Sequence, residues 1–195
     1  MELFQDVSII VVCCGETVYL ERCIRSCLAQ TFPGHSYEVL VVTAGFGSNE
    51  EETLDNYRQH IRVVRAEQAG VGETVRAGIR AARGRYLMLV AAEDFISDYA
   101  VLTQAIFLYD NSQYDGVAAD YWLVEPNSDY KCERVAAADR PLLYGILYRK
   151  EVFLQEVLRN ERFGQLDERA MLDAVQAHAR LANLPIAFYR RRREA

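Results

Sequence analysis

Two adjacent carboxylates, Glu93 and Asp94, follow a strongly apolar run at residues 86–90, and their chemistry stands out in this chain. A β-strand that is covered on both faces reads as such a continuous apolar run. In an open α/β sheet, ligands bind just beyond the carboxyl ends of the strands. The two acids therefore lie where a metal ion or a sugar would be held. The alternative is that they only begin the next loop and helix, where acidic residues are common.

Alternating apolar runs and amphipathic segments supply the elements that would position these acids. The pattern is typical of βα units and predicts a largely parallel sheet flanked by helices. We expect strands at residues 7–13, 38–42, 61–65, 86–90, 116–124, 142–148 and 186–189. Between the first two strands we expect a helix whose buried face carries apolar residues at helical spacing, namely Leu20, Cys23, Ile24, Cys27 and Leu28.

Three further helices are predicted from their start signals. Ser48 and Glu51 form a capping box for the second helix. The third follows Gly70 and runs to about Ala82. The fourth begins near Ser97, and its predicted apolar face is made of Leu102, Ala105, Ile106 and Tyr109.

Composition limits the function classes. With 195 residues, of which 51% are hydrophobic, the chain suits one domain spanning residues 1–195. A net charge of −6 argues against a nucleic-acid partner, which would require a basic surface. No apolar run approaches the roughly twenty residues that span a bilayer, so we expect a soluble, cytoplasmic protein. Five cysteines without Cys-x-x-Cys spacing predict reduced thiols and neither a disulfide nor a zinc site.

Two short glycine motifs do not indicate a dinucleotide site. Gly45 and Gly47 frame one of them, and Gly70 and Gly72 frame the other. Neither motif has the third glycine three residues on, and neither lies in the first βα turn. A dinucleotide-binding enzyme is therefore disfavoured.

The chain resembles the family-2 glycosyltransferases of the GT-A fold. The resemblance begins with the apolar segments at residues 7–12 and 37–42 and the helix between them. It continues through residues 70–79 and 83–86, which lead into the acidic strand end, and then through residues 145–150, 163–173 and 188–190. It therefore covers nearly the whole chain, and it rests on the order and spacing of these segments rather than on one signature.

This resemblance implies a nucleotide-sugar donor lying across the strand ends and a divalent metal, Mn²⁺ or Mg²⁺, on its diphosphate. It further implies a carboxylate base that deprotonates an acceptor hydroxyl for inverting transfer. The positions that match the family's donor site are Cys13, Cys14, Thr43, Gly45, Gly70, Arg76 and Glu93. Glu93 and Asp94 match the metal-binding strand end. The implied acceptor is a glycan, a lipid-linked molecule or a small molecule.

Several of these positions depart from the family's pattern. Ala91 and Ala92 precede Glu93, so the first acid of the usual Asp-x-Asp is absent. Thr43 stands where an aspartate would accept a hydrogen bond from the base, and Cys13 and Cys14 replace the usual residues after the first strand. The arginine of the third helix is displaced to Arg76, about 100° around that helix.

Asp167 lies at about the place of the family's Glu-Asp pair, at the start of a predicted helix, and is the candidate base. If the register differs by one residue, Glu168 takes that role. A carboxylate at a helix N-terminus is also favoured for its own sake, so capping is an equal alternative for Asp167.

The run of arginines at residues 190–193 has three interpretations. A solvated or partner-facing tail is the default, because chain ends are loosely held. The run could instead flank the donor diphosphate or contact anionic lipid at the inner face of a membrane. A homodimer contact is also compatible with the sequence.

The sequence thus favours an active GT-A glycosyltransferase. A catalytically degenerate GT-A module that binds nucleotide weakly or pairs with a partner is the first alternative. A nucleotidyltransferase is the second, although the loop after the first strand, Cys14-Gly15-Glu16-Thr17, lacks the basic, glycine-rich character that would hold a triphosphate.

Overall fold

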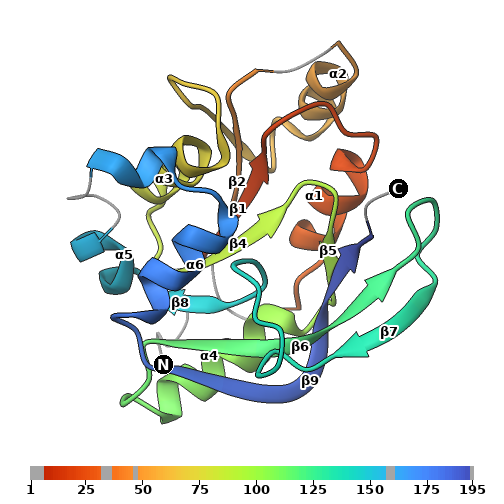
Figure 1. Ribbon diagram of the computed structural model, residues 1–195. Helices are drawn as coiled ribbons and strands as arrows, with labels where there is room; N and C mark the ends of the chain where they lie inside the picture. Colours follow the sequence, from red (N-terminus) through yellow and green to blue (C-terminus); the bar gives the residue numbers. More distant parts are fainter. Residues whose placement is uncertain (1–6, 32–36, 46–47, 157–160, 194–195) are drawn as a thin grey trace.

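A computed structural model describes residues 7–31, 37–45, 48–156 and 161–193 (Figure 1). Its strands join in one nine-stranded sheet with the order β3-β2-β1-β4-β8-β6-β9-β5, and β7 pairs with β6. The strands are β1 (Val7–Cys13), β2 (Tyr37–Thr43), β3 (Arg62–Arg65), β4 (Tyr86–Ala91), β5 (Phe95–Ile96), β6 (Gly116–Val124), β7 (Lys131–Val135), β8 (Leu147–Arg149) and β9 (Leu181–Arg192).

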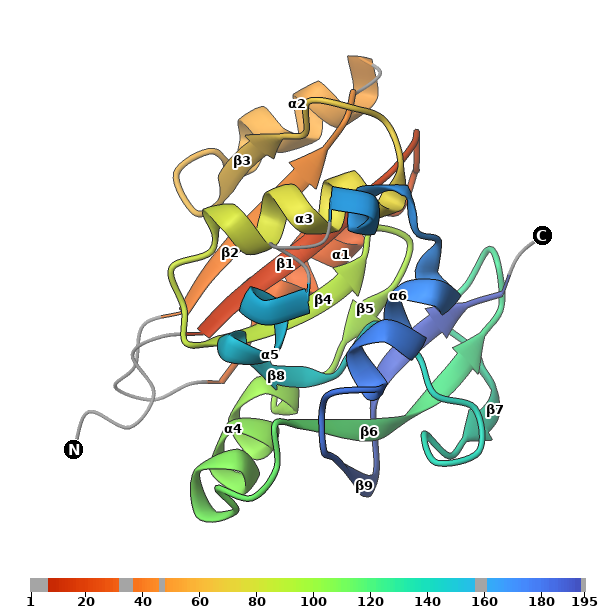
Figure 2. The same cartoon turned by 60° about the vertical axis from the view of Figure 1, so that its left-hand side comes forward.

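Helices cover both faces of this sheet (Figure 2). They are α1 (Leu20–Leu28), α2 (Ser48–Tyr57), α3 (Val71–Ala81), α4 (Ala100–Asp110), α5 (Lys150–Glu156) and α6 (Glu168–Gln176), with a 3₁₀ turn η1 (Glu161–Gln165) before α6. Helix α3 packs on β1 and β2 and also contacts η1 and α6, whereas α1 packs on the other face, beside α2. In the described part of the chain, no helix is both long enough and apolar enough to cross a membrane.

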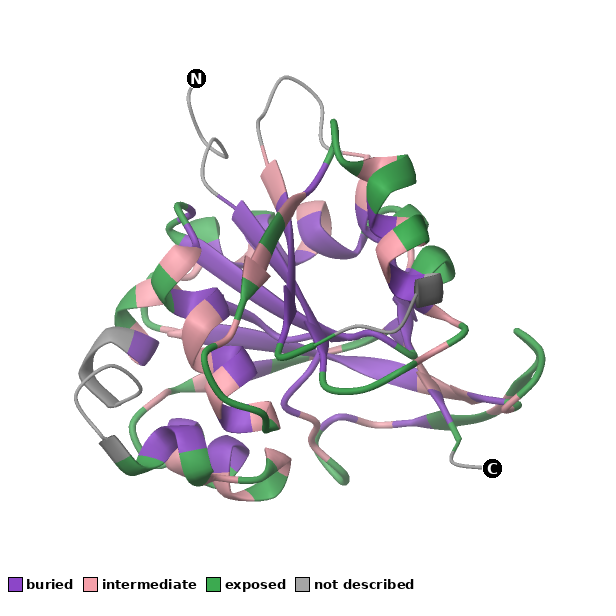
Figure 3. Ribbon diagram, turned by 90° about the horizontal axis from the view of Figure 1, so that it is seen from above, coloured by how far each residue is buried: buried purple, intermediate pink, exposed green. Residues whose placement is uncertain are grey.

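The half of the sheet formed by β3, β2, β1 and β4 is parallel, and its strands β1 and β4 run through the core. Every residue of β1 and β4 is buried, which explains their unbroken apolar sequences (Figure 3). The ends of these strands are in register, since Cys13 of β1 pairs with Thr43 of β2 and Val12 of β1 pairs with Ala91 of β4. Their carboxyl ends therefore meet at one edge of the sheet, as the sequence predicts.

The other half of the sheet is mixed. Strand β8 runs antiparallel to both β4 and β6, and β5 runs antiparallel to β9, whereas β6 and β9 are parallel. The predicted strand at 142–148 is wrong over most of its length, since only Leu147–Arg149 pairs. Gly145, with a φ of +76°, turns the chain just before it and donates its N–H to Leu89 O at 2.9 Å. Two short strands, β5 and β7, were not predicted from the sequence.

The helices follow their predictions with one correction. Helix α1 buries Leu20, Cys23, Ile24 and Cys27, and α3 spans nearly the predicted residues. The predicted face of α4 is wrong, because Ile106 and Tyr109 are 44% and 54% exposed. The buried face instead carries Ala100, Val101, Gln104, Ala105 and Leu108. The side chain of Ser48 lies outside the described residues, and Glu51 pairs with Arg65 at 2.8 Å.

Strand β9 is fastened to the end of β4 by the buried carboxylate of Asp94, which is 4% exposed. The Tyr189 hydroxyl donates to Asp94 Oδ2 at 2.7 Å, and the Arg192 N–H donates to Oδ1 at 2.8 Å. The same hydroxyl accepts the Ala91 N–H at 3.1 Å. We call Asp94, Tyr189 and the Arg192 backbone the β9 clasp. Burial raises the pKa of Asp94 to about 7, and the two hydrogen bonds only partly oppose that rise.

We predict that Gly145→Ala lowers the free energy of unfolding by about 1–3 kcal/mol. An added Cβ would lie 2.6 Å from Cδ2 of Tyr189, in a backbone conformation that L-residues rarely adopt. The matched control is Gly15→Ala, because a Cβ there meets nothing within 4 Å. Urea unfolding of both variants checks this. Equal midpoints for the two variants would show that the contact with Tyr189 relaxes at no cost.

We also predict that the parent loses stability relative to Asp94→Asn as the pH rises from 5 to 8. The pKa of Asp94 is about 7 when folded, above its ordinary value of about 3.9 when unfolded, so the folded state binds the proton more tightly. The stability that this proton contributes is fully present below about pH 4 and is lost as the pH rises through about 7. Asparagine cannot titrate. Urea unfolding in EDTA at both pH values measures the difference, and a constant difference would contradict the raised pKa.

Candidate active site

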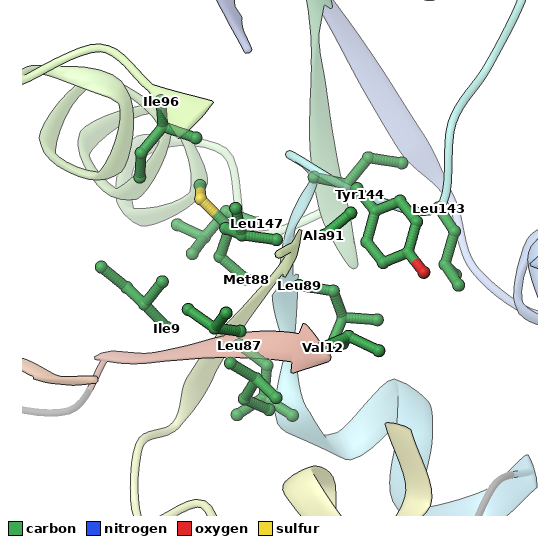
Figure 4. Packing of buried hydrophobic residues seen from close by; sticks show 14 of the residues in the cluster. Ile9, Val12, Leu87, Met88, Leu89, Ala91, Ile96, Leu143, Tyr144 and Leu147 are labelled. Atoms are coloured by element: carbon green, nitrogen blue, oxygen red, sulfur yellow. The ribbon is translucent and has the colours of Figure 1, made fainter. Parts of the chain in front are cut away.

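A cavity of about 400 Å³ opens beside the β9 clasp, at the carboxyl end of β4. We call it the strand-end cavity. Its chemistry comes from three acidic residues, three consecutive arginines and two tyrosines, namely Glu93, Asp94, Glu168, Arg191, Arg192, Arg193, Tyr19 and Tyr144. Figure 4 shows Tyr144 beside Ala91, where β4 ends. Acidic and basic groups from three separate segments, at the end of β4, the start of α6 and the end of β9, thus converge on one hollow.

Glu168 lines this cavity as the first residue of α6. Its Oε1 accepts the Tyr144 hydroxyl proton at 2.9 Å, and its Oε2 lies 3.8 Å from Arg191 Nη1. The side chain is 44% exposed, so the carboxylate is oriented by two partners and still open to the cavity. A carboxylate held in this way can accept a proton from a bound hydroxyl.

Asp167, one residue earlier, has a different position. Its Oδ1 accepts the Ala170 N–H at 2.8 Å and caps α6. It lines a second hollow of about 590 Å³, which also contains Gly70 and Arg76 and which we call the α6 hollow. The start of α6 therefore separates the two predicted base candidates, with Glu168 on the strand-end cavity and Asp167 on its neighbour.

The predicted donor-site residues divide between these places and the ends of β1 and β2. Gly70 begins α3 with a φ of +126°. Arg76 pairs with Glu73 one turn earlier, with Nε 3.2 Å from Oε2. Both residues line the α6 hollow rather than the strand-end cavity, whereas Glu93 is exposed and lines the latter.

At the ends of β1 and β2, the predicted residues stand next to each other. Cys13 is buried and donates its S–H to Gly15 O at 3.3 Å, and burial raises the pKa of its thiol to about 12. Cys14, the next residue, is exposed. The Thr43 hydroxyl donates to Gly45 O at 2.8 Å and accepts the Gly45 N–H at 3.0 Å. The Thr43 hydroxyl therefore stabilises the loop after β2, and this limits the hydrogen bonds that it can make to a nucleotide base.

The arginine run is part of the fold. Arg190 lies over the Phe95 ring at 5.8 Å. The Arg192 side chain is 5% exposed, lies 3.9 Å from the Tyr19 ring centre and donates to the carbonyl of Glu93 at 3.0 Å. The prediction of a solvated tail is therefore wrong for these residues, because β9 carries them into the sheet. Their partners are distant in sequence, and the local pattern gave no signal for them.

Arg191 faces the strand-end cavity with a side chain that is 30% exposed. Burial lowers the pKa of its guanidinium, whereas the nearby carboxylates of Asp94 and Glu168 raise it. The two carboxylates outweigh burial, so the pKa lies above its ordinary value. Arg191 is therefore a fixed positive charge in the cavity. The sequence raised Arg191 only as part of the arginine run at residues 190–193, for which flanking the donor diphosphate was one of the interpretations, and it did not indicate Tyr144.

The described residues fit a metal site poorly. In the described ranges, no three His, Cys, Asp or Glu side chains are placed so that they could hold a metal ion together. Both oxygens of Asp94 already accept hydrogen bonds from β9, and Ala91 stands where a further acid would be needed. Glu93 is the member of the predicted pair whose carboxylate is exposed, so the Mn²⁺ or Mg²⁺ prediction rests on that one residue.

Solved structures with this fold include the S. aureus protein TarS. Residues 1–349 of TarS in complex with UDP match 97% of this chain and 61% of that one, with a TM-score of 0.72 and 18% identity. The complex of the same TarS fragment with UDP-GlcNAc matches 98% of this chain and 59% of that one, with a TM-score of 0.71 and 17% identity. These likenesses confirm the α/β fold of the GT-A type.

Relatives known from their sequences point the same way. The glycosyltransferase RP339 of Rickettsia prowazekii is 24% identical over 83% of this chain and 54% of its own length. The glycosyltransferase EpsJ of Bacillus subtilis is 33% identical over 47% of this chain and 27% of its own length. The chain thus spans about half or less of these relatives. The family model for glycosyl transferase family 2 matches residues 8–159, which is most of the chain. The chain therefore belongs to glycosyl transferase family 2.

Proposed function

We propose that this chain transfers a sugar from a nucleotide-sugar donor to an acceptor hydroxyl by single displacement with inversion. The donor would lie across the ends of β1, β2 and β4, with its diphosphate in the strand-end cavity. One observation carries the proposal: an oriented, solvent-open carboxylate and a fixed guanidinium, Glu168 and Arg191, share the cavity at the end of β4. UDP and UDP-GlcNAc complexes of TarS, which has the same fold, support the donor class.

The two charged groups match the two demands of the reaction. An acceptor hydroxyl becomes a better nucleophile when a base removes its proton as it attacks the sugar carbon. The departing nucleoside diphosphate gains negative charge, which positively charged groups stabilise. Glu168 is suited to the first task, because Tyr144 and Arg191 orient its carboxylate. Asp167, predicted from the sequence as the base, has one oxygen committed to the cap of α6.

A non-catalytic GT-A module is the second candidate. The observation that favours it is the altered strand end, where Ala91 and the committed Asp94 leave few carboxylate oxygens for a metal. Such a module would bind a nucleotide without turning over its sugar. Donor binding alone does not separate it from an enzyme, whereas donor hydrolysis does.

We predict that millimolar UDP raises the melting temperature, whereas uridine at the same concentration has a smaller effect. Binding to the folded state stabilises by mass action, by about 2.7 kcal/mol at one hundred times the dissociation constant. Uridine lacks the diphosphate that the cavity would hold. Thermal unfolding with UDP, GDP, dTDP and uridine measures this. If no nucleoside diphosphate shifts the melting temperature, with or without manganese, the transferase proposal fails.

We predict that Glu168→Gln lowers the turnover of a UDP-sugar by about 10²- to 10⁴-fold, because the variant removes the base. Hydrolysis of the donor, with water as acceptor, provides the assay without knowledge of the natural acceptor. UDP binding by calorimetry should change little. The comparison variant is Asp167→Asn, since asparagine caps a helix about as well as aspartate.

The pair of variants separates the two carboxylates. Near-parental turnover by Asp167→Asn, with strong loss in Glu168→Gln, supports Glu168 as the base. The reverse result would assign the base to Asp167, as the sequence first indicates. Turnover that is equal in the parent and both variants would contradict a carboxylate base at the start of α6.

A further inference from the structure

We infer that the Arg191 guanidinium, rather than a metal held by carboxylates, neutralises the diphosphate of a bound donor. The inference rests on the proposed function and names the charge that would hold the donor. Three features of the strand-end cavity carry it: the state of its carboxylates, the direction in which Arg191 points, and the hydrogen-bonding capacity that Arg191 has left.

The carboxylates at the end of β4 serve the fold. Asp94 is 4% exposed and binds the Tyr189 hydroxyl and the Arg192 N–H, one with each oxygen. Each oxygen keeps a second lone pair, but burial leaves a metal little access to Asp94 while β9 is in place. Glu93 is left as a single exposed carboxylate at the strand end. One such oxygen ligand group holds a divalent ion weakly without further carboxylates.

The alternation of β9 points Arg191 into the cavity. Successive side chains of a strand lie on opposite faces. Arg190 and Arg192 share one face, since both guanidinium groups lie over the Phe95 ring, at 5.8 Å and 5.7 Å from its centre. Arg191 is on the other face, where it pairs with Glu168, and it lines the cavity together with Arg192 and Arg193.

Arg191 retains donors for a ligand. Arg192 donates to the carbonyls of Glu93, Glu125 and Ser128, and its Nη2 lies 3.2 Å from Asp129 Oδ1. Within the described residues, the ion pair of Arg191 is the long contact of 3.8 Å to Glu168. A guanidinium has five N–H donors in a planar fork, which matches the oxygens of a phosphate.

The position also suits the chemistry. Arg191 lines the same cavity as Glu93 at the end of β4, and its Nη1 lies 3.8 Å from Glu168 Oε2, so a diphosphate on Arg191 would place the sugar near the proposed base. A fixed guanidinium stabilises the charge that develops on the leaving diphosphate, as a metal would. Arginine stays protonated across the physiological pH range, so this contribution needs no titration.

The test is calorimetry of UDP binding to the parent, Arg191→Gln, Arg191→Lys and Arg169→Gln, each in EDTA and in manganese. Arg169→Gln is the matched control: it removes the same charge from α6, where Arg169 is 71% exposed and pairs with Asp173 on the helix surface. Uridine serves as the ligand without phosphate. Far-ultraviolet circular dichroism and the melting temperature verify that each variant folds.

We expect the parent and Arg169→Gln to bind UDP in EDTA about as tightly as in manganese. Arg191→Gln should weaken UDP binding in EDTA by about 10- to 100-fold, the usual loss for hydrogen bonds to a charged group. Uridine binding should be unchanged. Arg191→Lys keeps the charge but not the planar fork, so its affinity for UDP in EDTA should lie between those of the parent and Arg191→Gln.

Three results would overturn the inference, and they differ in what else they overturn. In the first, the parent binds UDP only in manganese, and Arg191→Gln binds UDP in manganese as tightly as the parent does. A metal then neutralises the diphosphate, and the transferase proposal stands. If the parent binds UDP under neither condition, both the inference and the transferase proposal fail. A loss of uridine binding in Arg191→Gln equal to the loss of UDP binding would show a structural effect, and it also counts against the inference.

Discussion

The buried carboxylate of Asp94 is the constraint on which the site depends. Taking a carboxylate out of water is costly unless hydrogen bonds replace its hydration. Both replacing donors, the Tyr189 hydroxyl and the Arg192 N–H, come from β9. Strand β9 must therefore be seated against the end of β4 before Asp94 is satisfied. Because neighbouring side chains of a strand alternate, this seating also turns Arg191 toward the cavity.

The fold explains why an acidic strand end need not be a metal site. Carboxylates after a buried strand are typical of ligand sites in open sheets. Here one of these carboxylates, Asp94, joins the parallel half of the sheet to its mixed half through its hydrogen bond with Tyr189 of β9. In the function that we propose, the positive charge that a leaving diphosphate requires would come from Arg191, on the same strand that satisfies Asp94. One interaction thus fixes the sheet and places the charge.

The parallel half of the fold could be predicted from sequence because its signals are local. Strands β1 and β4 are buried along their whole length and read as apolar runs, and α1 shows its buried face at helical spacing. Strand β9 could be recognised only in part, since its arginines read as a solvated tail and their partners lie about a hundred residues away. The face of α4 was misassigned because that helix has apolar residues on several sides.

The base that we propose, Glu168, lies one residue from the candidate that the sequence put first, Asp167. The resemblance located a carboxylate at the start of α6, but Asp167 and Glu168 differ by about 100° around the helix axis. Only the structure shows that Asp167 caps the helix and that Glu168 lines the strand-end cavity. Thr43 was a reasonable nucleotide contact by position, yet its hydroxyl is engaged by Gly45 in the loop. Such local commitments cannot be read from residue types.

A crystal structure of the parent with UDP, grown with manganese present, tests the central claim most directly. The account predicts a diphosphate in the strand-end cavity within hydrogen-bond distance of the Arg191 guanidinium, with the Asp94 carboxylate still bound to Tyr189 and Arg192. A manganese ion bridging Glu93 and the diphosphate, with Arg191 turned away onto Glu168, would contradict it. So would UDP bound in the α6 hollow beside Asp167 and Gly70.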